Sequence, residues 1–286
     1  MVTVPAMTAQ PLDLLHLGDP RRIGAYLLET DDGLALFDCG PASCVPALRV
    51  ALADRGVELR DVQHLLLSHI HLDHAGAAGV LVREHPGLTV HVSEVGLPHL
   101  VDPSRLETSA RRLYGEAFDE LWGELAPVPV ENVRAVGETV VGLACFPTVG
   151  HASHHVSFLH EDGTLYSGDA AGVRIEPGAF VYAPTPPPEV DLEAWERTLD
   201  ELGRREARRL ALIHFGVFED VERHVAELRR RLPEWAERVR DGASEEQFAA
   251  AAEADLAADR DAYEQAMPFW QSYAGLKRYW EKRAEA

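Results

Sequence analysis

Apolar and polar positions form blocks that predict strands and helices over most of the chain. Short runs rich in leucine, valine and isoleucine have the length of strands, and Asp31-Asp32-Gly33 predicts a hairpin turn between the second and third of them. The predicted strands are residues 12–17, 23–29, 33–38, 62–67, 89–92, 139–146, 156–160, 164–167 and 210–213. Stretches with apolar residues three or four positions apart predict helices between them, one at residues 75–84. This alternation indicates an α/β protein built of layers of sheet and helix.

Two proline-containing segments interrupt the alternation. Within residues 95–130, prolines bracket a predicted helix from Ser104 to about Leu121, and Ser104 with Glu107 matches a capping-box pattern at its start. Residues 176–190 contain five prolines, which exclude regular structure for most of that length. We therefore expect one helical and one irregular insertion in the layered fold.

The last quarter of the chain is predicted to be helical. Apolar residues keep a spacing of three or four from Glu219 onward. The final helix places four large apolar side chains on one face, those of Phe269, Tyr273, Leu276 and Trp280. We divide the chain into an α/β domain, residues 1–218, and a C-terminal helical region, residues 219–286. The aromatic face is expected to pack against the first domain or against a second subunit, as in a homodimer.

Composition narrows the classes of partner. The formal net charge is −20 over 286 residues, which argues against nucleic acid because phosphate backbones are bound by basic surfaces. No apolar run has the length of a membrane span, and Met1–Pro5 does not begin a signal peptide. We therefore expect no membrane partner and a cytoplasmic location. Cys39, Cys44 and Cys145 lie in apolar surroundings and do not form the pattern of a disulfide framework.

Four potential metal ligands lie within six residues, shortly after the apolar run at 62–67. His69, His71, Asp73 and His74 offer imidazole nitrogens and carboxylate oxygens, which bind zinc and similar divalent ions. A strand cannot wrap four ligands around one ion, because its successive side chains point to opposite faces. A loop beyond the strand can divide them, with His69 and His71 on one ion and Asp73 and His74 on a second.

Three more residues of ligand type follow later apolar runs. His151 comes after the predicted strand at 139–146, Asp169 after the strand at 164–167, and His214 directly after the strand at 210–213. Each can supply a ligand atom to one of the two ions, whose coordination the first four residues do not complete. We therefore predict a metal site assembled from loops at the ends of strands.

These seven residues in this order, together with Phe37-Asp38-Cys39-Gly40, resemble the metallo-β-lactamase superfamily on its glyoxalase II-like, zinc-hydrolase side. The resemblance spans residues 12–216 and implies a four-layer αββα sandwich, here with a C-terminal α-helical appendage. It implies a metal-dependent hydrolase in which a hydroxide held by two metal ions attacks a small-molecule substrate. A thioester or a carboxylic ester is the leading expectation. Zinc is the expected metal, and iron or manganese suits the same ligands.

The resemblance also implies roles for single residues. The first ion would be bound by His69, His71 and His151, and the second by Asp73, His74 and His214, with Asp169 as the bridge. Asp73 would orient the nucleophile and accept its proton. Asp38 and His155 would hold ligands in place by hydrogen bonds, although Asp38 can equally serve a turn before Gly40. His154 stands where the family commonly has a glycine, which leaves the role of His154 open.

Fewer residues support a prediction of how the substrate is bound. In this superfamily a segment just after the first motif tends to overhang the metal site, and the helix from Ser104 occupies that place. A surface excursion is the alternative. Arg105 and Arg112 fall on one face of this helix and are candidates to contact an anionic group of the substrate. Alternatively, both arginines pair with Glu107, Glu116 or other carboxylates.

Other activities of the same fold remain open. A persulfide dioxygenase shares much of this motif set but uses a single iron. A lactonase is disfavoured, because relatives of that type place a tyrosine shortly after the bridging aspartate, where this chain has Ala170, Ala171 and Gly172. A non-catalytic metal-binding scaffold is the third alternative. The full set of seven ligands favours the hydrolase with two metal ions.

Overall fold

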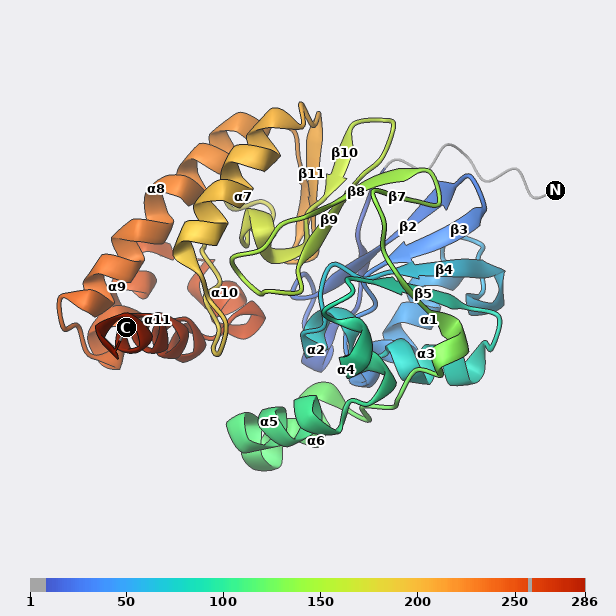
Figure 1. Ribbon diagram of the computed structural model, residues 1–286, viewed down its shortest axis with the longest axis horizontal. Coiled ribbons are helices and arrows are strands. Elements are labelled where there is room, and N and C mark those ends of the chain that lie inside the picture. The colour runs from blue at the N-terminus through green and yellow to red at the C-terminus, as the bar shows by residue number, and fades with distance from the viewer. Residues whose placement is uncertain (1–8, 257–258, 286) are drawn as a thin grey trace.

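Two sheets of six strands each lie face to face in the middle of the molecule (Figure 1). The computed structural model describes residues 9–256 and 259–285. The first sheet contains, in spatial order, β1 (Leu12–Asp13), β2 (Gly24–Thr30), β3 (Gly33–Phe37), β4 (Val62–Leu66), β5 (Thr89–Val92) and β6 (Val133–Ala135). The second contains β12 (Gly216–Phe218), β11 (Arg209–Leu212), β10 (Thr164–Tyr166), β9 (Val156–Leu159), β8 (Leu143–Pro147) and β7 (Thr139–Val140). β3 to β6 pair in parallel, as do β10 and β11, and the remaining pairs are antiparallel.

Aromatic side chains from both sheets form the centre of the core. The rings of Tyr26 and Tyr166 lie 5.5 Å apart edge to face, and those of Phe37 and Phe158 lie 6.0 Å apart. The Tyr26 hydroxyl is 2.7 Å from the carbonyl oxygen of Leu212 in the opposite sheet. A buried hydroxyl needs such a partner, since leaving it unpaired costs about 1–3 kcal/mol. The sheets are therefore joined by both apolar packing and a hydrogen bond.

Helices cover the outer faces of both sheets. α1 (Val45–Ala53) and α3 (Ala78–Glu84) lie on the first sheet, and α7 (Leu192–Arg204) and α8 (Val221–Arg240) lie on the second (Figure 1). Trp195 and Leu199 of α7 are fully buried against Leu210 of β11. The order of layers is helix, sheet, sheet, helix, so the predicted αββα sandwich is confirmed.

Several predicted elements have different bounds. The strand predicted at 12–17 ends after Asp13, because left-handed backbone and a 3-10 turn follow it. The helix predicted at 75–84 begins later, as α3 at Ala78, because Ala75 is the last residue of a separate short helix, α2 (Leu72–Ala75). The strand predicted at 139–146 is divided into β7 and β8 by a turn in which Val141 and Gly142 have positive φ. In each case the chain reverses or kinks where the apolar pattern alone continues.

The helix predicted from Ser104 to Leu121 is two helices, α5 (Ser104–Tyr114) and α6 (Phe118–Trp122). Gly115 ends α5 with a φ of 57°, which favours glycine. The predicted capping box does not form, because Ser104 is already helical and its backbone N–H donates to the Asp102 carboxylate at 3.2 Å. After α4 (Leu97–Val101), these two helices project from the lower side of the sandwich in Figure 1.

The C-terminal region is helical, as predicted, and packs on its own chain. α8 is followed by α9 (Glu245–Leu256), α10 (Arg260–Ala266) and α11 (Phe269–Glu285). Phe269 and Leu276 of α11 are buried in a cluster with Trp235 of α8 and with Tyr182. The proposed boundary after residue 218 falls between β12 and α8, and contact with a second subunit stays a prediction.

Among residues 9–256 and 259–285, no helix combines the length and the apolar composition of a membrane span. The three cysteines are buried and unpaired, as expected. The segment Met1–Pro5, in which we expect no signal peptide, lies outside the described residues.

Candidate metal centre

Loops at one edge of the sandwich bring all seven predicted ligands together. The motif that begins at His69 follows β4, and the other three ligands follow β8, β10 and β11. Asp169 lies in a 3-10 turn, Gly168–Ala171, directly after β10. Side chains at the ends of neighbouring strands meet at one edge, so residues up to 145 positions apart become neighbours: His69 and His214 share this site.

The first group of ligand atoms consists of three imidazoles. Nδ1 of His71 lies 2.8 Å from Nε2 of His69 and 3.0 Å from Nε2 of His151. One ring nitrogen cannot satisfy two imidazoles at once by hydrogen bonding, because it carries at most one proton or one lone pair. Three nitrogens that converge in this way can instead share one cation.

The second group combines one carboxylate with two imidazoles. Oδ2 of Asp73 lies 3.2 Å from Nε2 of His214 and 3.6 Å from Nε2 of His74. These atoms lie within 4.8 Å of one another, as do those of the first group. The two groups correspond to the two halves predicted for the site.

Asp169 lies between the two groups. Its Oδ2 is 3.4 Å from Nε2 of His151, and its Oδ1 is 3.4 Å from Nε2 of His74. Both Oδ2 of Asp169 and Nε2 of His74 are buried and lack a hydrogen-bond partner. Leaving buried polar atoms unpaired costs free energy. A bound metal ion would give these two atoms a partner, so the residues present fit a metal site.

Hydrogen bonds at the far side of the rings fix which nitrogen faces the centre. Nδ1 of His74 lies 2.8 Å from Oδ2 of Asp38, Nδ1 of His151 lies 2.9 Å from a main-chain oxygen, and Nδ1 of His214 lies 2.6 Å from another. The two main-chain oxygens belong to Pro184 and Arg22. Because these oxygens accept, each Nδ1 carries a proton and each Nε2 faces the centre, where it can bind a metal ion.

Asp38 and His155, the two predicted supporting residues, both contact the centre. The Asp38 carboxylate accepts from the backbone N–H and the hydroxyl of Ser68 at 2.8 Å each, besides its bond to His74. It is fully buried and does not serve the alternative local turn. Nε2 of His155 accepts the backbone N–H of Asp169 at 3.1 Å, so His155 positions the central carboxylate.

The electrostatics of the site favour cations. Burial lowers the pKa of His69 and of His71, and neighbouring imidazoles lower it further, so both rings are neutral near pH 7. Burial raises the pKa of Asp169, but His74 and His151 outweigh it and hold that pKa well below its usual value. Burial lowers the pKa of His74 and of His214, but the carboxylates of Asp73 and Asp169 outweigh it and raise both, so a bound metal ion would replace a proton on these two rings. The site thus combines imidazoles with ionised carboxylates, the combination that binds divalent metal ions.

A cavity of about 280 Å³ opens beside His71 and Asp73. Arg105 lines it, whereas Arg112, two turns further along α5, does not. Neither arginine pairs with Glu107, which instead binds Arg111 at 2.8 Å. The α5 segment therefore lies over the site, as the resemblance implied. His154 also lines the cavity, with its ring stacked on that of His69 at 5.9 Å.

Sequence reasoning missed several polar residues in this cavity, among them one from α5 and one from α11. Tyr114 comes from the end of α5 and Gln271 from α11, and the negative charge of Asp73 contributes to a raised pKa of the Tyr114 hydroxyl, behind the larger effect of burial. Gln271 lies in the region that we expected to be an appendage. Its burial, which leaves the residue 5% exposed, is seen only in the structure.

Comparison with known proteins decides the family. Residues 18–214 match the model of the Metallo-beta-lactamase superfamily. The chain belongs to this superfamily. Over 145 residues it is 31% identical to a hydroxyacylglutathione hydrolase of Stenotrophomonas maltophilia, a match that covers 51% of this chain and 44% of the relative. The matches to curated relatives span between 35% and 63% of the length of those proteins.

Solved structures of the superfamily share the fold. A metallo-beta-lactamase family protein of Thermus thermophilus superimposes with a TM-score of 0.65 at 22% identity, covering 98% of this chain and 94% of that one. The protein TTHA1623, solved in a di-iron-bound form, gives a TM-score of 0.54 at 28% identity, covering 70% of this chain and 92% of that one. The match to the Thermus thermophilus family protein includes the C-terminal helical region.

Proposed function

We propose that this protein is a metal-dependent hydrolase that cleaves a thioester or a carboxylic ester with two divalent metal ions. The observation that supports it most is the position of Asp169, with one oxygen directed to each group of ligands. A carboxylate has two oxygens and can bridge two ions. The di-iron form of TTHA1623 and the likeness to a hydroxyacylglutathione hydrolase agree with this proposal.

Each ligand then has a defined task. One ion would be held by His69, His71 and His151 and the other by Asp73, His74 and His214, and zinc is our first choice of metal, before iron or manganese. Divalent ions in this centre would lower the pKa of a coordinated water and polarise a carbonyl group. The chain supplies imidazole and carboxylate donors, fixes their orientation and keeps the centre buried.

Asp73 is the proposed catalytic residue. It is the carboxylate of the site that also lines the cavity, and its side chain is 13% exposed, compared with 2% for Asp169. In hydrolysis the water oxygen bonds to the carbonyl carbon and the carbon–sulfur or carbon–oxygen bond breaks. The Asp73 carboxylate accepts the proton from water and returns it to the departing thiolate or alkoxide.

The test is a side-by-side assay of thioesters, lactones, phosphodiesters and glutathione persulfide with metal-loaded protein. We expect hydrolysis of a thioester or ester, its loss on chelation, and a fall of about a hundredfold or more in kcat for Asp73→Asn. The exposed Asp54→Asn serves as the matched control and should retain full activity. Oxygen consumption with persulfide as the sole activity would contradict the proposal.

A further inference from the structure

The cavity beside the metal centre has the lining of a binding site for an apolar chain. Its walls come from α5, from the Pro186–Pro188 segment and from the C-terminal region, and they include Leu106, Ala110, Leu113 and Met267. Ligand sites in proteins are mainly apolar with a few placed polar groups. One end of this cavity reaches Asp73 of the metal centre. An apolar chain in the cavity would therefore lead to the centre.

Arg105 is the only lysine or arginine that lines this cavity among the described residues. Arg105 forms no ion pair with a carboxylate of the described residues. Its charge contributes to the lowered pKa of Asp102, behind the hydrogen bonds from Ser104, but the two side chains form no ion pair. The one glutamate in the lining, Glu189, accepts a hydrogen bond from Ser153. The guanidinium of Arg105 is thus left with free donors at the exposed edge of the cavity.

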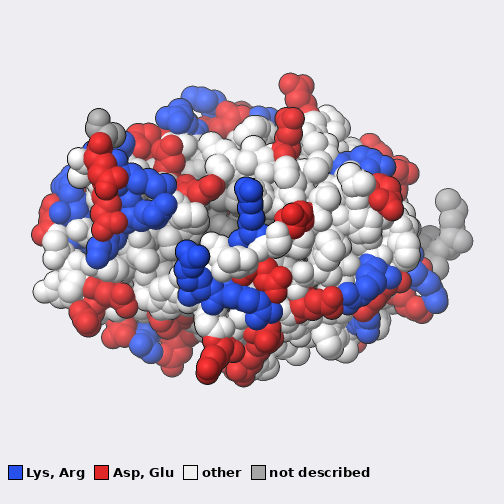
Figure 2. Space-filling view, turned by 60° about the horizontal axis from the view of Figure 1, so that its bottom comes forward, with Lys and Arg blue, Asp and Glu red and all other residues white. Residues whose placement is uncertain are grey.

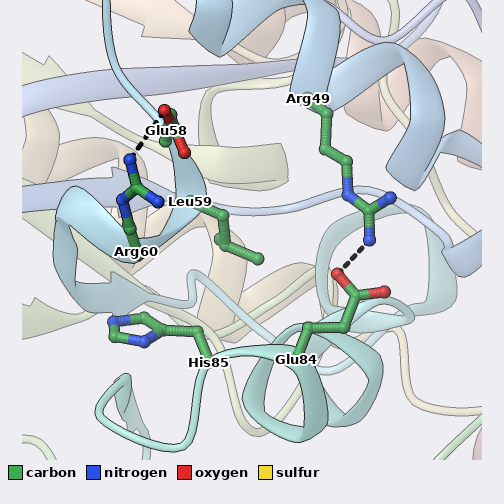
Figure 3. A pocket seen from close by; sticks show the side chains of 6 residues that line it. All are labelled: Arg49, Glu58, Leu59, Arg60, Glu84 and His85. Atoms are coloured by element: carbon green, nitrogen blue, oxygen red, sulfur yellow. Dashed lines mark hydrogen bonds and ion pairs between the residues drawn. The ribbon is translucent and has the colours of Figure 1, made fainter.

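Most arginines of this acidic protein pair with a carboxylate, and among those of the described residues that do not, Arg105 is the one that lines this cavity. Figure 2 turns the lower side of the molecule toward the viewer and shows basic side chains adjoining acidic ones over much of that face. A second hollow illustrates the usual arrangement (Figure 3): there Arg60 pairs with Glu58 at 2.8 Å, and Arg49 pairs with Glu84. The charges of that hollow neutralise one another, whereas the cavity at the metal centre keeps one cation available.

We infer that the cavity binds the apolar chain of a substrate that also carries a free carboxylate, and that Arg105 binds this carboxylate. Arginine suits this task because its planar fork meets both oxygens of a carboxylate. The substrate class is thus an ester or thioester of a carboxylate-ended chain. This inference rests on the proposed function for the position of the bond that is cleaved, beside Asp73, but not for the binding itself.

The first experiment uses metal-free protein, so that its outcome does not depend on catalysis. Calorimetric titrations with octanoate and with octan-1-ol compare a charged and a neutral ligand with the same chain. Arg105→Met should weaken octanoate binding about five- to tenfold and leave octan-1-ol binding unchanged. Arg112→Met is the matched control, because Arg112 lies on the same helix but outside the cavity, and both affinities should stay unchanged. Equal effects of the two substitutions, or none, would overturn the inference.

A second pair of variants tests the cavity. Ala110→Leu adds bulk to its wall and should weaken binding of both octanoate and octan-1-ol, because less apolar surface of the chain can be buried. Ala117→Leu, at an exposed position between α5 and α6, is the control and should bind as the wild type does. Unchanged binding by a folded Ala110→Leu protein would place the ligand elsewhere and contradict the inference.

Turnover by metal-loaded protein separates this inference from the proposed function. A suberyl monothioester and an octanoyl thioester differ in the terminal carboxylate, and Arg105→Met should raise KM about five- to tenfold for the first alone. If neither is hydrolysed but octanoate binding still depends on Arg105, the proposed function fails and the inference stands. Hydrolysis of both with no dependence on Arg105 would refute the inference and leave the proposed function intact.

Discussion

At the scale of single residues, the centre depends on which ring nitrogen of each histidine carries the proton. The Asp38 carboxylate is the clearest case, because it accepts three hydrogen bonds and one of them comes from Nδ1 of His74. Burial raises the pKa of Asp38, while His74 and Ser68 oppose that rise by hydrogen bonding to the ionised form. The ring of His74 is therefore oriented by a buried acceptor, and its Nε2 is directed to the centre.

Asp38→Asn tests this orientation. The amide replaces one acceptor oxygen by an NH₂ group. If that group faces His74, then Nδ1 either loses its hydrogen-bond partner or must become the acceptor, which moves the ring proton to Nε2. We expect metal affinity to fall about 10–100-fold with little change in secondary structure, as for other residues that orient metal ligands. Affinity can be measured by competition with a chromophoric chelator, with the exposed Asp54→Asn as the control. Wild-type affinity in a folded Asp38→Asn protein would show that this orientation is unimportant.

At the scale of elements, α11 joins the C-terminal region to the sandwich. Phe269 is 2% exposed and lies 5.9 Å from the ring of Tyr182. Further along α11, the backbone of Gly275 packs directly against the backbone of Thr185. A Cβ at Gly275 would lie only 1.9 Å from the carbonyl oxygen of Thr185, so only glycine fits there. α11 thereby holds the proline-containing segment that contributes one wall of the cavity.

Phe269→Ala should destabilise the protein by about 3–5 kcal/mol, because it removes a large buried side chain and leaves a cavity. Lys277→Ala, at an exposed position of the same helix, should change stability by less than about 0.5 kcal/mol. Chemical denaturation of both variants provides the comparison. Equal stability of Phe269→Ala and wild type would mean that α11 does not pack as described.

α8 carries a buried histidine that makes stability depend on pH. Burial lowers the pKa of His224 to about 4, and its Nε2–H donates to the carbonyl oxygen of Ala171 at 2.7 Å. The unfolded chain takes up this proton near pH 6.5 and the folded one does not until about pH 4. The contribution of His224 is therefore complete above pH 6.5 and is lost as the pH falls toward 4.

His224→Gln keeps a donor for Ala171 but cannot titrate in this range. Between pH 7 and pH 4, the wild type should lose stability relative to this variant by on the order of 2 kcal/mol. Denaturation at several pH values measures the difference, and contributions from the other histidines cancel in the comparison. Parallel stability curves for the two proteins would contradict the shifted pKa.

At the scale of the whole molecule, the two predicted domains share one site. The sandwich supplies the candidate metal ligands, and the C-terminal region supplies Met267 and Gln271 to the cavity wall. The helical region is therefore part of the candidate binding site as well as of the core. The helical appendage is present as expected, but its contribution to the cavity was not predicted, because helical spacing shows which residues share a face and not what that face covers.

The convergence of the candidate ligands could be predicted from the sequence for a physical reason. His151, Asp169 and His214 each follow an apolar run, and the ends of neighbouring strands meet at one edge of a sheet. The acceptors from Pro184 and Arg22 could not be predicted, because every residue has a carbonyl group and only the fold selects these two. The break of the helix at Gly115 was also missed, since glycine occurs inside helices as well as at their ends.

The metal content of the protein tests the central claim most directly. Protein purified without chelator and dialysed should contain close to two divalent metal ions per chain by plasma mass spectrometry. Asp169→Ala should lose most of the second ion, because the oxygens that face both groups of ligands are removed. One ion per chain in the wild type, or an unchanged metal content in Asp169→Ala, would contradict a two-metal centre bridged by this residue.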